Sequence, residues 1–204
     1  MFTENEVASL ISRQEILDRV NNLKQEFIST EAQFLEITDH DFLSLIILTP
    51  SVGIALANGS VSLFEEISLN KKARKLSKGG YWMKKDPVVV AMGYLIKHYD
   101  AWADKFYEVL RVVMEMSFDS SELKASSVDS PDVSDEEFCY VGLKAPFIFI
   151  RYLTSFFLDD EEEDLVAERH LSQVERDRII DIGQKIGFTE VPLFNKFVTK
   201  LKVR

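Results

Sequence analysis

Five Ser/Thr-x-x-Glu patterns constrain the fold of this chain more than any other feature of its sequence. They begin at Thr3, Ser12, Ser62, Ser134 and Ser172. In such a capping box the hydroxyl accepts a hydrogen bond from a free amide of the first helical turn, and the carboxylate accepts one from the capping residue. Apolar residues at helical spacing follow the boxes, for example from Ile16 to Phe27. The pattern predicts an all-α helical bundle.

Other signals extend this helical pattern. Thr38 and the acids beside it predict a helix over 42–48, and Pro50 predicts the start of a further helix, because proline is tolerated in a first turn. Gly79-Gly80 predicts the end of the helix that begins at Leu63. Three further helical regions are predicted, namely 88–118 with a bend near 97–100, one that follows Ser172 and ends near Gly187, and a last one from Thr189 to about Leu201.

The segment 119–134 is rich in serine and aspartate, a composition that cannot bury enough apolar surface to stay ordered by itself. It predicts a flexible linker between an N-terminal helical half, 1–118, and a C-terminal half, 135–204, that packs on the first. The segment 146–158 suits either a helix or a strand, because it is aromatic and β-branched. We predict a helix there, since no partner strands are evident.

Several features favour a soluble cytoplasmic protein. Cys139 is the single cysteine, so no disulfide forms within the chain. The first residues lack the basic and apolar regions of a signal peptide. The apolar stretches 43–57 and 146–158 are shorter than the ~20 residues that cross a membrane, which predicts no transmembrane segment.

Charge is unevenly distributed along the chain. The net charge of −10 argues against broad nucleic-acid binding, which needs a basic surface. The segment 71–85, however, contains no acid, and two aromatic residues lie among its cations. Cations and rings together suit an acidic protein partner or an anionic membrane surface; the alternative is an ordinary solvated helix face. The predicted partner-binding residues are Lys71, Lys72, Arg74, Lys75, Lys78, Tyr81, Trp82, Lys84 and Lys85, with Lys71, Lys75 and Lys78 on one helix face.

Two segments, 61–76 and 171–186, share a capping box and a similar apolar pattern, which is either an internal repeat or two ordinary amphipathic helices. The first follows the sequence Ala-Leu-Ala-Asn-Gly at 55–59. This stretch resembles the TerB-like domains, in which an apolar helix ends in Ala-x-Ala-Asp-Gly before the next helix. The resemblance implies two repeated helical halves, a stress-related complex and acidic metal ligands at the turn. Here the family's Asp is replaced by Asn58, which removes one charge from that ligand set.

Metal binding is the alternative function. The resemblance suggests Asn58, Glu65 and Glu66 as ligands, and the run of six acids at 159–164 adds Asp159, Glu161 and Glu163. Carboxylates suit Ca²⁺ or Mg²⁺, but the run lacks the alternation of an EF-hand loop and equally fits a solvated loop or a partner for the basic segment.

Catalysis has little local support. The three histidines lack the usual zinc spacings, and no nucleophile motif is present. His40 fits half of a metal site or a helix cap region, and His98 fits a polar seam or a small-molecule active site. We therefore expect a non-catalytic protein-interaction module of a cytoplasmic, stress-related complex, without a cofactor unless a divalent metal binds. Metal binding or sensing is the second hypothesis, and a small-molecule enzyme is the third.

Overall fold

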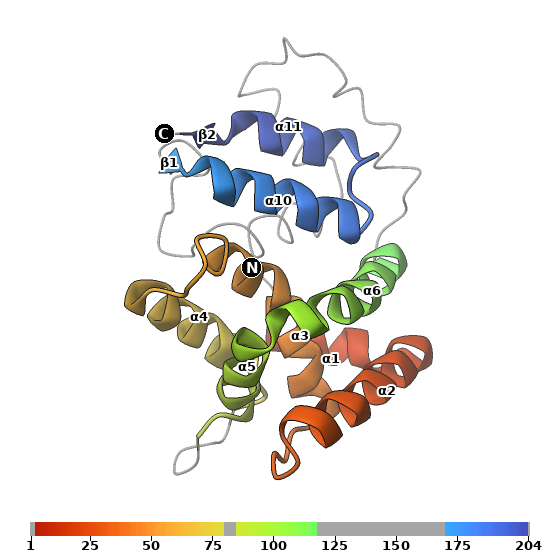
Figure 1. Cartoon of the computed structure of the whole chain (residues 1–204). Helices are drawn as coiled ribbons and strands as arrows, with labels where there is room; N and C mark the ends of the chain where they lie inside the picture. Colours follow the sequence, from red (N-terminus) through yellow and green to blue (C-terminus); the bar gives the residue numbers. More distant parts are fainter. Residues whose placement is uncertain (1–2, 80–84, 118–169, 204) are drawn as a thin grey trace.

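The computed structural model describes residues 3–79, 85–117 and 170–203 (Figure 1). These residues form an all-α bundle, as the sequence predicts, with one short pair of strands at its C-terminal end. None of the described helices is long and apolar enough to cross a membrane. The elements are α1 (Glu4–Ile11), α2 (Gln14–Glu31), α3 (Asp39–Ala55), α4 (Leu63–Leu76), α5 (Pro87–Lys97), α6 (Tyr99–Ser117), β1 (His170–Leu171), α10 (Gln173–Lys185), α11 (Pro192–Lys200) and β2 (Lys202–Val203).

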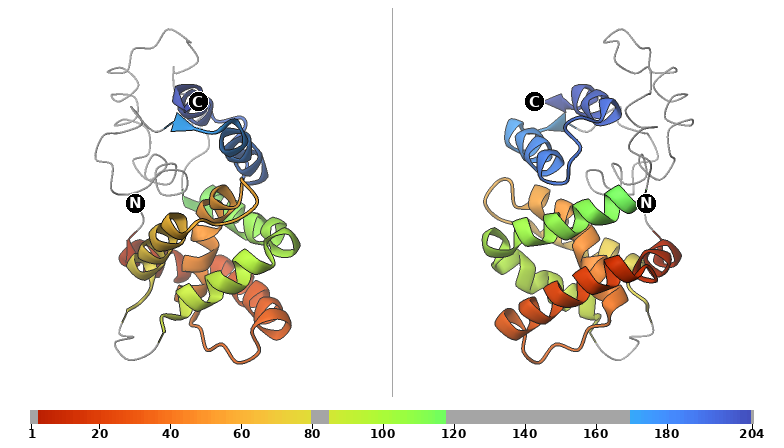
Figure 2. Two further views of the ribbon diagram at one scale, coloured as in Figure 1. Left: turned by 60° about the vertical axis from the view of Figure 1, so that its left-hand side comes forward. Right: turned by 90° about the vertical axis from the view of Figure 1, so that its right-hand side faces the viewer.

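Helix α3 lies at the centre of the bundle. Every residue from His40 to Ala55 is buried. The helix contacts α1, α2, α4, α5, α6 and α10, and α2 and α4 lie on opposite sides of it (Figures 1 and 2). A helix that is apolar around most of its circumference is stable only when neighbours cover it on all sides. The sequence of α3 therefore dictates its central place.

Pro50 lies inside α3, so the predicted start of a new helix at this residue is wrong. A proline in a helix interior removes one backbone hydrogen bond and costs ~3 kcal/mol or more. The helix continues through Pro50 because Pro50 and its neighbours Thr49 and Ser51 are buried by other elements, which oppose any break. The local sequence indicates that proline destabilises a helix interior, but it does not reveal the tertiary packing that keeps α3 intact at Pro50.

Three predicted capping boxes are present, at Thr3, Ser62 and Ser172. The box predicted at Ser12 is absent. Helix α2 follows Arg13, which makes no side-chain cap, and the Ser12 hydroxyl instead donates to the Ser9 carbonyl oxygen at 2.7 Å. Ser12 already ends α1, so the turn between the two helices is too short for it to cap the second.

Other predicted boundaries are close to those observed. The bend expected near 97–100 is a complete break, with His98 between α5 and α6. The last helix begins at Pro192 rather than at Thr189, because the fixed φ of proline suits a first helical position. After this helix, Lys202 and Val203 pair in parallel with His170 and Leu171.

Helix α10 packs on α3 and α6, and α11 packs on α10, as a layer on one side of the first six helices (Figures 1 and 2). One hydrophobic cluster runs continuously through both parts. At their junction the hydroxyls of Tyr99 and Tyr107 hydrogen-bond to each other, and Tyr107 also donates to the Thr49 carbonyl oxygen at 3.4 Å. A Cβ atom on Gly53 would lie 2.2 Å from the Tyr99 hydroxyl and 3.1 Å from Ile182 of α10. Only glycine allows this close approach.

Four aromatic rings fill the space between α2, α3 and α6. The Phe27 ring contacts those of Phe42, Trp102 and Phe106, with centroid distances of 5.8, 5.0 and 5.4 Å. The indole nitrogen of Trp102 donates to the Glu31 carboxylate at 2.7 Å, so the polar tip of the ring is satisfied where it leaves the core. Large rings thus supply much of the buried area here.

Several predictions fall outside the described residues. These are the linker 119–134, the helix after Ser134, the thiol of Cys139, the segment 146–158 and the acid run 159–164. The division into two halves therefore stays a prediction. So does the repeat, although its two segments, in α4 and α10, both begin with capping boxes and both pack on α3.

Candidate functional site

Helix α4 carries the described part of the basic segment. Lys71, Arg74 and Lys75 are exposed along the helix, and Lys78 and Lys85 are exposed beyond it. Arg74 and Lys75 lie in the last turn, where cations interact favourably with the helix dipole. These exposed cations form a positive surface on a chain whose net charge is −10.

Two details of the predicted basic surface are wrong. Lys72 is buried, and its ammonium donates to the Ser51 hydroxyl of α3 at 3.4 Å, so it does not belong to an exposed surface. Lys78 does not share a helix face with Lys71 and Lys75, because α4 ends at Leu76 and Ser77 is extended. The sequence favours a slightly later end, at Ser77, because the pair Gly79-Gly80 is typical of a helix terminus, and Gly79 does have a positive φ in the structure.

A buried polar cluster fixes the end of α4 against the start of α3. The Asp41 carboxylate is fully buried; it accepts a hydrogen bond from the Lys78 amide at 2.8 Å and one from the Thr38 hydroxyl at 3.0 Å. The Ser44 hydroxyl donates to the Leu76 carbonyl oxygen at 3.0 Å. These bonds satisfy backbone groups that a helix end leaves unpaired, and they hold the basic residues of α4 in a fixed position.

Apolar side chains extend the same surface toward the start of α4. Leu63, Phe64 and Ile67 are exposed, and Phe64 is 85% exposed to solvent. Their exposure is not predicted by the sequence, because a capped helix with regularly spaced apolar residues predicts that those residues face the core. The signal that was available is the width of the apolar pattern, since Leu69, Ala73 and Leu76 already supply the buried face.

The suggested metal ligands do not form a site among the described residues. Asn58 and Glu66 are exposed, and the Glu65 carboxylate accepts hydrogen bonds from the Ser62 amide and hydroxyl at 2.7 and 2.6 Å. Within 3–79, 85–117 and 170–203, no three His, Cys, Asp or Glu side chains are grouped to hold a metal ion. Asp159, Glu161 and Glu163 lie outside these ranges, as do Tyr81, Trp82 and Lys84 of the basic segment.

His40 and His98, the histidines considered for a metal site and an active site, both link neighbouring helices. His40 is buried next to Asp41, and its Nε2 lies 3.2 Å from the Glu4 carbonyl oxygen, which links α1 to α3. The Nε2 of His98 lies 3.4 Å from the Glu31 carboxylate, which also accepts from Trp102. This arrangement agrees with the polar seam, here between α2 and the start of α6.

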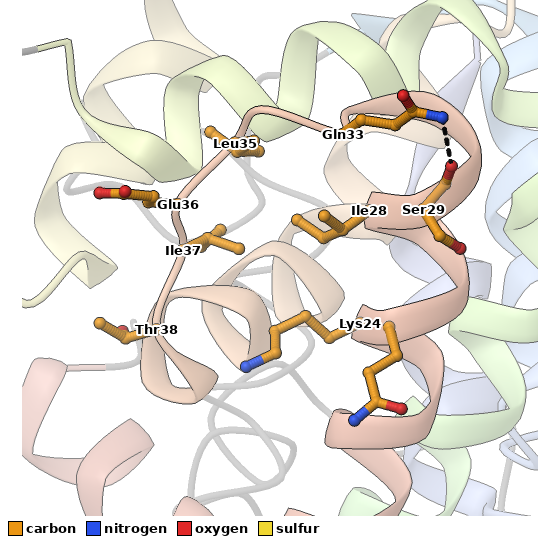
Figure 3. A pocket seen from close by; sticks show the side chains of 9 residues that line it. Lys24, Ile28, Ser29, Gln33, Leu35, Glu36, Ile37 and Thr38 are labelled. Atoms are coloured by element: carbon orange, nitrogen blue, oxygen red, sulfur yellow. Dashed lines mark hydrogen bonds between the residues drawn. The ribbon is translucent and has the colours of Figure 1, made fainter.

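A pocket of about 840 Å³ lies between the C-terminal half of α2 and the loop that leads to α3. Ile28, Leu35 and Ile37 line it together with the Lys24 stem, and the Gln33 amide donates to the Ser29 carbonyl oxygen at 3.2 Å (Figure 3). Its cation is already engaged, since Lys24 pairs with Asp39. Among the described residues, its lining includes neither His98 nor any candidate ligand, so it does not support the catalytic hypothesis.

Comparison with protein-family models, with curated proteins and with solved structures finds no match to this chain. The resemblance to TerB-like domains therefore stays a prediction that rests on residues 55–66.

Proposed function

We propose that this chain is a non-catalytic protein-interaction module that binds an acidic partner through the exposed cations of α4 and of the segment after it. The observation that carries the proposal is the exposure of Lys71, Arg74, Lys75, Lys78 and Lys85 over a stretch, 71–85, that contains no acid. The TerB-like resemblance adds a stress-related cytoplasmic complex as the setting.

Charge complementarity explains why such a partner would be acidic. Clustered cations attract the carboxylates of a partner before contact and set the orientation of the encounter. Acidic residues elsewhere on this chain repel the same partner. The Debye length at physiological salt is about 8 Å, so acidic residues further away are largely screened. The electrostatic potential near the cluster is therefore set by its own cations rather than by the net charge of the chain. Asp41 and Ser44 hydrogen-bond to the end of α4 and fix its position, so binding a partner loses less conformational entropy there.

The test is a pull-down from native lysate with the full chain and a K71E/K75E/K78E variant, at low and high salt. The matched control is R19E/K97E/R111E, which changes the net charge equally but on α2, α5 and α6. We expect a salt-sensitive partner that the wild type and the control retain and the α4 variant loses. Equal capture by all three proteins would refute the proposal.

A further inference from the structure

The outer surface of α4 changes from apolar to cationic along the helix axis. Phe64 and Ile67 are three residues apart and Lys71 follows four residues later, so these side chains are neighbours on one face. Arg74 and Lys75 continue that face. With a rise of 1.5 Å per residue, the face from Phe64 to Lys75 is roughly 16 Å long, about three helical turns.

The exposed apolar residues are not needed by the core of the protein. Leu69, Ala73 and Leu76 occupy the opposite side of α4 and are buried against the bundle. Single exposed apolar residues are common, but adjacent ones on a helix next to a cationic cluster indicate a contact surface. Phe64 has the large, rigid ring that typically contributes most of the binding energy in an interface.

We propose, building on the function above, that the partner contributes an amphipathic helix whose apolar anchors pack on Leu63, Phe64 and Ile67 and whose adjoining carboxylates pair with Lys71, Arg74 and Lys75. Such a helix needs two apolar residues at helical spacing and, one or two turns further along its axis, a group of Asp or Glu. Its apolar part supplies desolvation energy, and its acids fix the register along α4.

The geometry favours a helix over an anionic membrane as the occupant. A helix that lies on a membrane has an apolar stripe along its whole length, with cations on either side. On α4 the apolar and cationic parts follow one another along the axis, and the exposed Glu66 borders the apolar part, one turn after Leu63. A membrane contact would cover only the first turns of α4 and would place Glu66, at the edge of the contact, near negatively charged headgroups.

The experiment measures binding of the full chain to three probes. The first is a fluorescent synthetic peptide with two Leu residues at i and i+4 followed by four Glu residues, the second is a scrambled peptide of the same composition, and the third is a vesicle of phosphatidylcholine and phosphatidylserine. We expect the first peptide to bind roughly tenfold more tightly than the scrambled one, because only it places both groups in register. We expect F64S/I67S to remove this preference, and F34S to preserve it. Phe34 is the matched control because it is 98% exposed and lies outside α4.

The outcomes separate this inference from the function on which it rests. Equal binding of both peptides, lost in K71E/K75E/K78E, would retain an acidic partner but overturn the amphipathic helix. Binding to vesicles alone would overturn the class of partner. Binding to none of the probes would overturn the inference, and the pull-down would then decide the proposed function by itself. Far-UV circular dichroism of each variant confirms that α4 stays folded.

Discussion

At the scale of single residues, the junction of α3, α6 and α10 depends on Gly53. The hydroxyls of Tyr99 and Tyr107 occupy the space that a side chain would fill, at 2.2 and 2.8 Å from a Cβ atom placed there. Neither ring can withdraw easily, because both are buried and the two hydroxyls are bonded to each other. The tolerance of this position for other residues is therefore set by two side chains distant in sequence.

Replacing Gly53 by Ala should lower the free energy of unfolding by about 1–3 kcal/mol, the usual cost of overpacking. Chemical denaturation measures it. Gly93→Ala is the control, because nothing lies near its Cβ position and alanine favours a helix by ~0.5–1 kcal/mol, so it should stabilise. Adding Tyr99→Phe should recover part of the loss at Gly53; if it recovers nothing, the clash is not with that hydroxyl.

The same tyrosines predict how stability depends on pH. Burial raises the pKa of Tyr99 and raises the pKa of Tyr107 well above 10.0. The folded state therefore retains these protons more strongly than the unfolded state does. Their contribution to stability is complete below pH ~10, the unfolded pKa, and is lost as the pH rises toward the folded values.

We expect the free energy of unfolding to fall above pH ~10, as measured by urea denaturation at several pH values. A hydrogen bond to Asp104 raises the pKa of Lys185, which acts in the same direction because the ammonium form is the one stabilised. Tyr107→Phe should flatten the dependence and Lys185→Met should flatten it less, since Lys185 is more exposed. An unchanged slope in Tyr107→Phe would contradict this assignment.

At the scale of elements, helix starts were predictable where the capping residue does not end a preceding helix. Neither Ser62 nor Ser172 ends another helix, and each caps the start of the helix that follows it, as the sequence predicts. Ser12 has the same local pattern but ends α1 instead. A capping box thus predicts a helix start only if the preceding helix has already ended, which depends on contacts the local sequence does not contain.

Replacing Ser172 by Ala should destabilise the chain by ~1 kcal/mol, because the Glu175 amide loses its acceptor. Replacing Ser12 by Ala should change stability by less than ~0.5 kcal/mol, since its hydroxyl only donates to a carbonyl oxygen at an exposed turn. Thermal unfolding of the two variants provides the comparison. A loss at Ser12 as large as that at Ser172 would show that the predicted box forms in solution.

Burial was harder to predict than secondary structure. The periodicity of α4 gives its helix and its basic end, but not that Lys72 contacts Ser51 or that Phe64 faces solvent. The side chain that a helix buries depends on which neighbour covers it, and those neighbours come from distant parts of the chain. For that reason the cations of the candidate site were mostly found from the sequence, whereas its apolar part and the Asp41 cluster were found only in the structure.

At the scale of the whole molecule, α10 belongs to the same hydrophobic cluster as the first six helices. Ile182 is fully buried at the contact with α3, close to Gly53. The two parts should therefore unfold together, because separating them would expose apolar surface on both.

Ile182→Ala should lower the free energy of unfolding by roughly 2–5 kcal/mol, because it leaves a cavity in this contact. The fluorescence of Trp102, measured in a Trp82→Phe background, reports the ring cluster between α2, α3 and α6. Its transition should shift together with the far-UV signal of all helices. If the far-UV signal shifted while the Trp102 transition stayed in place, the two parts would be independent folding units.

The central place of α3 has a consequence for synthesis on the ribosome. Its apolar residues emerge early, whereas the α10 residues that cover part of them follow only after the whole central portion of the chain. At 5–20 residues per second, the delay is on the order of ten seconds. Throughout that interval the apolar surface of α3 that α10 later buries stays exposed on the nascent chain. Such a chain is a natural client for a chaperone that binds at the tunnel exit.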